Sequence, residues 1–240
     1  AVAGLTCRCS AWGGEARGAP VGADATSWKT PDKTPVNAFA VIKIVERVCR
    51  ETGADPAIFS LIIGDGPSLG QRMAADERIP LISATGSTRM GFDVAKTVHG
   101  RLGITIMELG GNNALLVTPT AELKMATSAI FFGSVGPAGQ RCTSTRRVIM
   151  HESVAPEVEA SLLRAYKSVK IGSPTERETL MGPLIDPEAV KNVEQSIAKA
   201  KEEGGEVLYG GEKLEGEKFA GGCYMTPCLV RAKPDFKIVQ

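Results

Sequence analysis

Short apolar runs alternate along the chain with stretches in which apolar residues recur at a helical period. The runs, bounded by glycine, proline or polar turns, predict strands at 59–63, 80–84, 104–108, 113–117 and 147–151. The helical stretches predict helices at 36–51, at 68–76, from the turn at 85–91 to His99, at 121–134, at 156–167 and from Asp186 to Gly204. Strands that alternate with helices predict an α/β protein with a largely parallel sheet.

Burial and the two ends of the chain add further expectations. We expect the run at 59–63 to be a buried strand and the helix at 121–134, rich in Ala, Ile and Phe, to be buried on most sides. Strands are also predicted at 207–209 and 224–230, and the apolar residues 236–239 have the pattern of a strand. Residues 1–23 are rich in Ala and Gly without a sustained period, which predicts irregular structure.

Composition and charge narrow the class of protein. With 43% hydrophobic and 23% charged residues, the chain has the composition of an ordinary globular protein. The net charge of +1 gives no sign of a nucleic-acid or membrane-surface partner, and no apolar run is long enough to span a bilayer. The first residue is Ala rather than Met, so we expect a piece of a longer protein.

Cysteine usage indicates a reducing, intracellular setting, either cytoplasmic or mitochondrial. The six cysteines are few and irregularly spaced, which argues against a disulfide framework. Zinc usually needs paired ligands at tighter spacing together with histidine, and the chain has only His99 and His151, so we predict no metal site. Cys49 follows the apolar pattern of a predicted helix, and we expect it in the core.

Glu108 and Cys142 are the candidate catalytic pair. Glu108 ends a predicted strand, and Gly110 and Gly111 follow it, where the missing side chains let another group approach closely. Cys142 lies in a Gly-rich loop, one strand and one helix later. A base and a thiol in one cleft can form and hydrolyse a thioester. The alternatives are a solvent-facing carboxylate and a plain buried thiol.

A second group of residues has the pattern of a nucleotide site. Gly86, Ser87 and Gly91 lie in a strand-to-helix turn whose amides could bind phosphate, although such turns also cap helices that bind no ligand. Lys29 precedes a turn bracketed by prolines and is either a ribose contact or a surface lysine. Asp32 could accept a hydrogen bond from a ribose 2′-hydroxyl and so repel a 2′-phosphate, or it is an ordinary turn residue.

Three motifs together resemble the aldehyde dehydrogenase superfamily. They are Gly-Ser-Thr at 86–88, Glu-Leu-Gly-Gly at 108–111 and Gly-Gln-Arg-Cys-Thr at 139–143. Asn112-Asn113 is similar to a narrower group, the antiquitin-like branch of α-aminoadipic semialdehyde dehydrogenases, because most of the superfamily has Lys at the first of these positions. The resemblance covers about residue 24 to the end of the chain.

The resemblance implies a fold with two domains, both incomplete in this chain. Residues 24–110 would belong to a Rossmann-like NAD-binding domain with a parallel sheet, and residues 111–240 to an α/β catalytic domain that carries the nucleophilic cysteine. Residues 1–23 match nothing in the family. The resemblance also implies that the whole protein forms a homo-oligomer, a dimer or a tetramer.

The resemblance further implies NAD-dependent oxidation of an aldehyde to a carboxylate, with α-aminoadipic semialdehyde of lysine catabolism as the substrate. Cys142 would add to the aldehyde, its backbone N–H and an upstream Asn would hold the alkoxide, and Glu108 would activate the water that hydrolyses the thioester. Lys29 and Asp32 match the positions that hold the adenosine ribose, where the family usually has Glu in place of Asp32.

The remaining matched positions concern phosphate and substrate. Ser87, with Gly86 beside it and Gly91 in the same turn, matches the pyrophosphate contact. Arg141 would meet the carboxylate of a semialdehyde. The competing interpretation is that Arg141, with Arg146 or Arg147, only favours the thiolate of Cys142.

Two departures from the family leave alternatives open. About Thr6 stands where the family has the oxyanion-hole Asn, and the chain ends before the family's Glu-x-Phe segment and its oligomerisation strand. The chain is therefore either the central part of a semialdehyde dehydrogenase or a catalytically incomplete fragment with residual nucleotide binding or a structural role. An acylating enzyme that uses coenzyme A is a third option, against which Glu108 argues because an external thiol needs no base.

Overall fold

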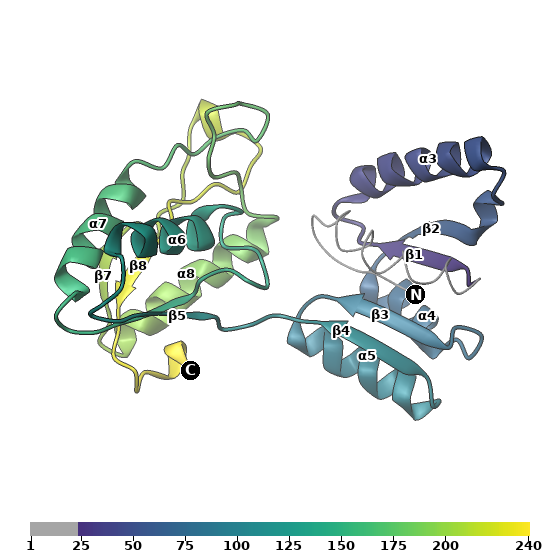
Figure 1. Cartoon of the computed structure of the whole chain (residues 1–240), viewed down its shortest axis with the longest axis horizontal. Helices are drawn as coiled ribbons and strands as arrows, with labels where there is room; N and C mark the ends of the chain where they lie inside the picture. The colour runs from purple at the N-terminus through teal and green to yellow at the C-terminus, as the bar shows by residue number, and fades with distance from the viewer. Residues whose placement is uncertain (1–23) are drawn as a thin grey trace. The chain divides into compact units, whose positions relative to one another are not determined.

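Parallel strand pairs form the framework of the chain. A computed structural model describes residues 24–240, so the expectations for residues 1–23, including Thr6, lie outside the described residues (Figure 1). The strands are β1 (Thr26–Thr30), β2 (Phe59–Ile63), β3 (Leu81–Thr85), β4 (Ile104–Glu108), β5 (Ala114–Val117), β6 (Arg147–Met150), β7 (Glu206–Tyr209) and β8 (Leu229–Arg231). β1 pairs with β2, β3 with β4 and β5 with β6 in parallel, whereas β7 and β8 are antiparallel.

Helices separate these strands, and the described residues divide into two compact units, one that ends at Gly110 and one that runs from Gly111 to Gln240. The α-helices are α3 (Pro35–Thr52), α4 (Gln71–Ala75), α5 (Thr88–Gly100), α6 (Leu123–Val135), α7 (Ala155–Lys167) and α8 (Pro187–Glu202). Shorter helical turns are η1 (Pro56–Ile58), η2 (Gly66–Gly70), η3 (Glu217–Phe219) and η4 (Lys237–Val239). None of the helices between residues 24 and 240 combines the length and apolarity of a membrane span.

The first unit places helices against each of its two strand pairs. α3 covers the β1–β2 pair (Figure 1). Trp28, on β1, is buried in the core that these strands share with α3. α3 starts at Pro35, whose missing N–H suits the first helical turn, and is capped by Gly53, which adopts the left-handed φ of 74° that favours glycine. α4 and α5 supply the other core with β3 and β4, which buries Ile82 and Val98. Both helix–strand layers thus follow the predicted α/β pattern.

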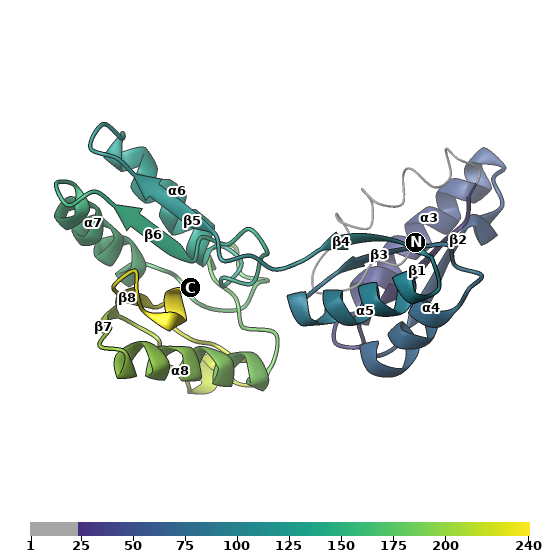
Figure 2. The ribbon, with the colours of Figure 1, turned by 90° about the horizontal axis from the view of Figure 1, so that it is seen from below.

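The second unit is built on β5 and β6. α6 and α7 lie beside this pair (Figure 2), and the shared core buries Val117, Ile130 and Val158. α8 begins where the side chain of Asp186 accepts a hydrogen bond of 2.8 Å from Ala189 N, as its capping pattern predicted. α8 then lies beside the antiparallel pair of β7 and β8 (Figure 2).

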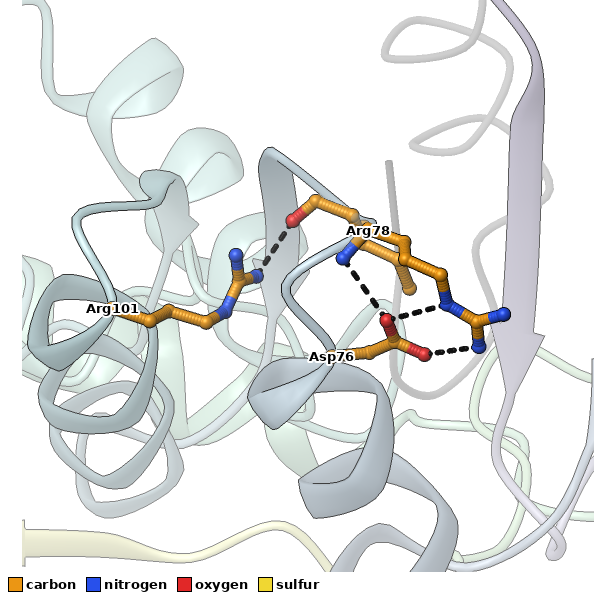
Figure 3. Close-up of polar contacts among 4 residues, drawn as sticks. Asp76, Arg78 and Arg101 are labelled. Carbon is orange, nitrogen blue, oxygen red and sulfur yellow. Dashed lines mark hydrogen bonds and ion pairs between the residues drawn. The ribbon is translucent and has the colours of Figure 1, made fainter.

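A charged cluster ties together the loop between α4 and β3 (Figure 3). Asp76 accepts hydrogen bonds from Nε and Nη2 of Arg78, at 2.9 and 2.6 Å, and from the Arg78 backbone N–H at 3.0 Å. Arg101, which follows α5, donates from Nε to Ala74 O at 2.8 Å and from Nη2 to Ile79 O at 2.6 Å. The two bonds from Arg101 connect both ends of the loop to the end of α5.

Asp76 leads to a prediction about how the stability of the fold depends on pH. Hydrogen bonds from Arg78 hold the pKa of this carboxyl well below its usual range. Such a group stabilises the fold above its unfolded-state pKa of about 3.9, and the stabilisation is lost as pH falls through the folded-state pKa. We expect Asp76→Asn to lower the melting temperature modestly at neutral pH, with a deficit that shrinks below about pH 4. Melting curves across this range would contradict the expectation if the deficit stayed constant.

Four expectations about burial and strands are wrong. β2 is half exposed, not buried, because Ser60 and Ile63 are exposed and, within residues 24–240, the strand pairs with β1 alone. α6 is not buried on most sides, since Met125 and Phe132 are 69% and 60% exposed. Residues 224–230 form a strand only from 229 onward, because Pro227 lacks a ladder N–H. Residues 236–239 form the 3₁₀ turn η4, not a strand.

Candidate active site

The ends of β3 and β4 bring together part of the predicted nucleotide site and the predicted base. Thr85 and Glu108 are register partners, and Gly86 N donates to Glu108 O at 2.9 Å. Ser87 caps α5, because its Oγ accepts a hydrogen bond of 3.1 Å from Met90 N. Gly86, Ser87 and Glu108 therefore lie next to one another in the first unit, at the exposed start of a helix.

Gly91 is required where α5 meets the residue that follows Glu108. A Cβ atom added at Gly91 would lie 2.5 Å from Leu109 Cδ1, which is closer than two non-bonded carbon atoms approach in proteins. Gly91 is itself buried in the structure. Its small size lets the first turn of α5 lie against the end of β4, so Gly91 shapes the site through the backbone.

Lys29 is a buried lysine, not a surface lysine. Its side chain lies on β1 with only 7% exposed. Burial lowers the pKa of Lys29 below its ordinary value, and the negative charges of Asp32 and Asp65 oppose that shift. Asp65 follows β2, and hydrogen bonds from the side chain and backbone of Ser68 lower its own pKa. A buried ammonium group near two carboxylates is typical of a functional site.

Asp65 is a candidate that the sequence reasoning missed. In the sequence it lies in a Gly-Asp-Gly-Pro turn, a pattern that indicates only a chain reversal. The parallel register of β1 and β2 brings that turn near Lys29, which no spacing along the chain reveals.

Cys142 lies in a tight turn at residues 141–144. Ser144 N donates to Arg141 O at 3.2 Å, and Arg141 N donates to Ser144 Oγ at 3.1 Å. Ser144 is only 2% exposed, whereas Cys142 is half-buried. The side chain of Arg141 is exposed. A buried hydroxyl therefore anchors the turn that carries Cys142.

The loop that leads into this turn has an uncommon backbone. Ala138 and Gly139 adopt left-handed φ values of 53° and 69°. The left-handed region costs a non-glycine residue about 1 kcal/mol, so Ala138 is a strained position next to the candidate nucleophile. Gln140 holds the end of the loop, because its Oε1 accepts from Ile185 N at 2.9 Å and its Nε2 donates to Pro183 O at 3.3 Å.

Asn113 was marked in the sequence only as part of the Asn112-Asn113 motif, without a role in the site. Its Nδ2 donates to Cys142 O at 2.6 Å and to Ser144 O at 3.0 Å. Its backbone oxygen accepts hydrogen bonds from the N–H groups of Arg146 and Arg147, at 3.1 and 3.0 Å. Asn113 thus connects the start of β5 with both the cysteine turn and the start of β6.

Arg146 and Arg147 bind backbone oxygens in the structure. Arg146 donates from Nε to Gly111 O at 2.9 Å and from Nη2 to Arg141 O at 3.2 Å. Arg147 donates from Nε and Nη2 to Asn112 O at 3.2 and 2.9 Å. Both guanidinium groups therefore connect the Gly-Gly-Asn-Asn segment to the cysteine segment.

A cavity of about 630 Å³ lies in the second unit, lined by residues of α6, α7, α8, β6 and β8. Ser144, Thr145 and Arg146 form part of its wall, but Cys142 does not line it. Within residues 24–240 no group of three or more His, Cys, Asp and Glu side chains is arranged to hold a metal ion.

A family model extends over all of the described residues. The model of the aldehyde dehydrogenase family matches residues 22–240. The chain belongs to the aldehyde dehydrogenase family. The resemblance inferred from the three sequence motifs is thereby confirmed.

Curated relatives point to one group of aldehyde dehydrogenases. A putative aldehyde dehydrogenase family 7 member A1 homolog of Dictyostelium discoideum is 42% identical over 213 residues, which are 89% of this chain and 41% of that protein. The α-aminoadipic semialdehyde dehydrogenase of Bos taurus is 40% identical over 207 residues, which are 86% of this chain and 38% of that protein. The chain thus spans less than half the length of these two aldehyde dehydrogenases.

Solved structures of aldehyde dehydrogenases share the fold. Lactaldehyde dehydrogenase from Escherichia coli has a TM-score of 0.88 and 30% identity, with 99% of this chain and 49% of that chain covered. Betaine aldehyde dehydrogenase from Staphylococcus aureus, in complex with NAD+, has a TM-score of 0.84 and 26% identity, with 90% and 42% covered. The predicted aldehyde dehydrogenase-like α/β fold is confirmed.

In this aldehyde dehydrogenase chain the candidate pair is divided between the two units. Glu108 ends β4 in the first unit and its side chain is exposed, whereas Cys142 lies in the second unit. The pairing of the two groups in one cleft stays a prediction, and the roles of the nucleotide residues and of Arg141 stay predictions with it.

Proposed function

We propose that the protein to which this chain belongs oxidises a carboxylate-bearing aldehyde to a carboxylate, with NAD and through a thioester on Cys142. The observation that carries the proposal is the half-buried thiol of Cys142, in a turn held on both sides by hydrogen bonds. The identity of 40% with the Bos taurus α-aminoadipic semialdehyde dehydrogenase supports a semialdehyde of that kind as the substrate.

NAD fits the residues of the first unit. The exposed start of α5, with Ser87 as its cap and the small Gly86 and Gly91 around it, suits a pyrophosphate. The buried Lys29 and the nearby Asp32 suit ribose hydroxyls. NAD+ in the Staphylococcus aureus betaine aldehyde dehydrogenase supports this choice of cofactor. When bound, NAD would supply the acceptor for the hydride that leaves the substrate.

The residues of this chain would then have the following chemical roles. The thiolate of Cys142 adds to the aldehyde carbon, and the backbone N–H of Cys142 stabilises the negative oxygen. Glu108 takes a proton from water as that water attacks the thioester, which releases the acid and restores the thiol. Arg141, whose side chain is exposed beside the nucleophile, pairs with the carboxylate of the substrate.

We include two further points in the proposal. The whole protein works as a homo-oligomer, a dimer or a tetramer, as the resemblance to the family suggests. It works in a reducing compartment, cytoplasmic or mitochondrial, and the reduced state of the four described cysteines supports this choice.

NADH production tests the proposed function. The whole protein, incubated with NAD and α-aminoadipic semialdehyde, is expected to form NADH, which fluorescence measures, and the corresponding acid. Absence of both products would contradict the proposal. The same assay on the 240-residue chain, with NAD binding measured by calorimetry, tests the alternative of a fragment that binds nucleotide without turnover.

Asp32 gives a prediction about the choice between NAD and NADP. A carboxylate near the ribose repels a 2′-phosphate, so Asp32→Ser should raise the ratio of kcat/KM for NADP to kcat/KM for NAD by about tenfold, which corresponds to about 1.4 kcal/mol. Steady-state kinetics with both cofactors measures the ratio. Asp55, which caps η1 through Ala57 N, offers a matched control, and Asp55→Ser should leave the ratio unchanged.

A further inference from the structure

Both peptide planes that flank Cys142 are held through their carbonyl oxygens. The oxygen of the Arg141–Cys142 peptide accepts from Ser144 N and from Arg146 Nη2, both at 3.2 Å. The oxygen of the Cys142–Thr143 peptide accepts from Asn113 Nδ2 at 2.6 Å. Since peptide units are planar, fixing both planes also fixes the two backbone dihedrals of Cys142 between them.

The dihedrals of Cys142 determine two directions that matter for its chemistry. In a trans peptide the N–H points opposite to the C=O, so fixing Arg141 O aims the N–H of Cys142 away from the interior of the turn. The same dihedrals set the direction of the Cα–Cβ bond and hence of the sulfur. A rigid turn therefore keeps the sulfur and the N–H in one fixed relation, as attack on a carbonyl group requires.

Asn113 is itself held tightly in its place. Its backbone oxygen accepts two hydrogen bonds from the start of β6, and the two hydrogens of its amide serve two carbonyl oxygens of the cysteine turn. Gly111 leaves space for this arrangement, because a Cβ atom there would lie 2.8 Å from Asn113 Oδ1 and 3.4 Å from Cys142 O. Asn113 thus joins the segment after Glu108 directly to the nucleophile's backbone.

We propose that Asn113 is a positioning residue, which orients the backbone of Cys142 so that its N–H faces the oxygen of a carbonyl group under attack by its sulfur. The inference rests on the proposed function, because it takes Cys142 as the nucleophile. Asn113 acts through the carbonyl oxygens of residues 142 and 144.

Two reagents separate orientation from simple reactivity of the thiol. p-Nitrophenyl acetate acetylates a thiolate: the sulfur–carbon bond forms through a tetrahedral oxyanion, the ester bond breaks, and p-nitrophenolate leaves with the electron pair. Iodoacetamide alkylates the same thiolate by displacing iodide and forms no oxyanion. The first rate depends on an oriented N–H donor and the second does not. Neither reaction needs NAD.

The experiment measures both rates at Cys142 in the whole protein by peptide-resolved mass spectrometry. For Asn113→Ala we expect acetylation to slow by about tenfold or more, as on loss of an oxyanion donor. Alkylation should change by less than about twofold. Arg146→Met, which releases the other peptide plane, should show the same selective loss. Asn112→Ala is the matched control, because Asn112 Nδ2 donates to Val239 O and Gln240 O, and it should alter neither rate.

Each outcome decides the inference. Unchanged acetylation in Asn113→Ala, or an equal fall in both rates, would overturn it, and melting curves would show whether an equal fall reflects unfolding. If the unsubstituted protein is acetylated no faster at Cys142 than at the similarly exposed Cys223, the proposed function fails, and the inference fails with it. Rapid acetylation of Cys142 that Asn113→Ala leaves unchanged overturns the inference alone.

Discussion

Cys142→Ala is expected to abolish NADH production by the whole protein. Without the sulfur no thioester forms, and loss of a covalent nucleophile costs about 10⁴-fold or more in kcat. The fold should survive, because Cys142 is only half-buried and the bonds cited for its turn do not use its side chain. Assays of purified variants with NAD and α-aminoadipic semialdehyde measure the loss.

Cys49→Ala is the matched control for this prediction. Cys49 is 4% exposed in the core of the first unit, as the sequence pattern predicted. Removing its sulfur leaves a small cavity, so we expect the free energy of unfolding to fall by about 1 kcal/mol while kcat stays unchanged. Equal loss of activity in both variants would mean that Cys142 is not the nucleophile.

Glu108→Gln is expected to slow hydrolysis of the thioester without preventing its formation. The amide cannot accept a proton from the attacking water, and loss of a general base typically costs about 10² to 10⁴ in rate. Stopped-flow fluorescence should therefore show a burst of NADH close to one equivalent per active site, followed by a slow steady state. Glu122 offers a control, because it caps α6 in the second unit.

Coenzyme A distinguishes the hydrolytic enzyme from an acylating one. If Glu108→Gln turned over at the unsubstituted rate, and coenzyme A accelerated both proteins, the thioester would be passed to an external thiol and Glu108 would not be the base. We expect coenzyme A to have no effect on the unsubstituted protein.

The sequence predicted the order and type of most elements because they depend on local pattern. The strand at 104–108 and the Asp186 cap of α8 match the structure, since apolar runs and capping residues act over a few positions. Exposure was harder to predict: Phe132 has the pattern of a core residue yet is 60% exposed, because periodicity does not say which sides of a helix find a partner.

The sequence indicated only part of the candidate site, because contacts across the fold leave no local pattern in the sequence. Glu108, Ser87 and Cys142 are prominent in the sequence because Glu108 ends an apolar run before Gly110, Ser87 follows Gly86, and Cys142 lies in a Gly-rich loop. Asn113 and Asp65 act through contacts across the fold, Asn113 with backbone oxygens and Asp65 with the charge of Lys29. Such contacts impose no period or spacing on the sequence.

The most direct test is to locate the acyl group after a single turnover. The Glu108→Gln whole protein would be mixed with NAD and α-aminoadipic semialdehyde, quenched in acid and digested for mass spectrometry. The account predicts an α-aminoadipyl group on the peptide that contains Cys142. An acyl group on Cys49, Cys223 or Cys228, or no acylated peptide although NADH has formed, would contradict it.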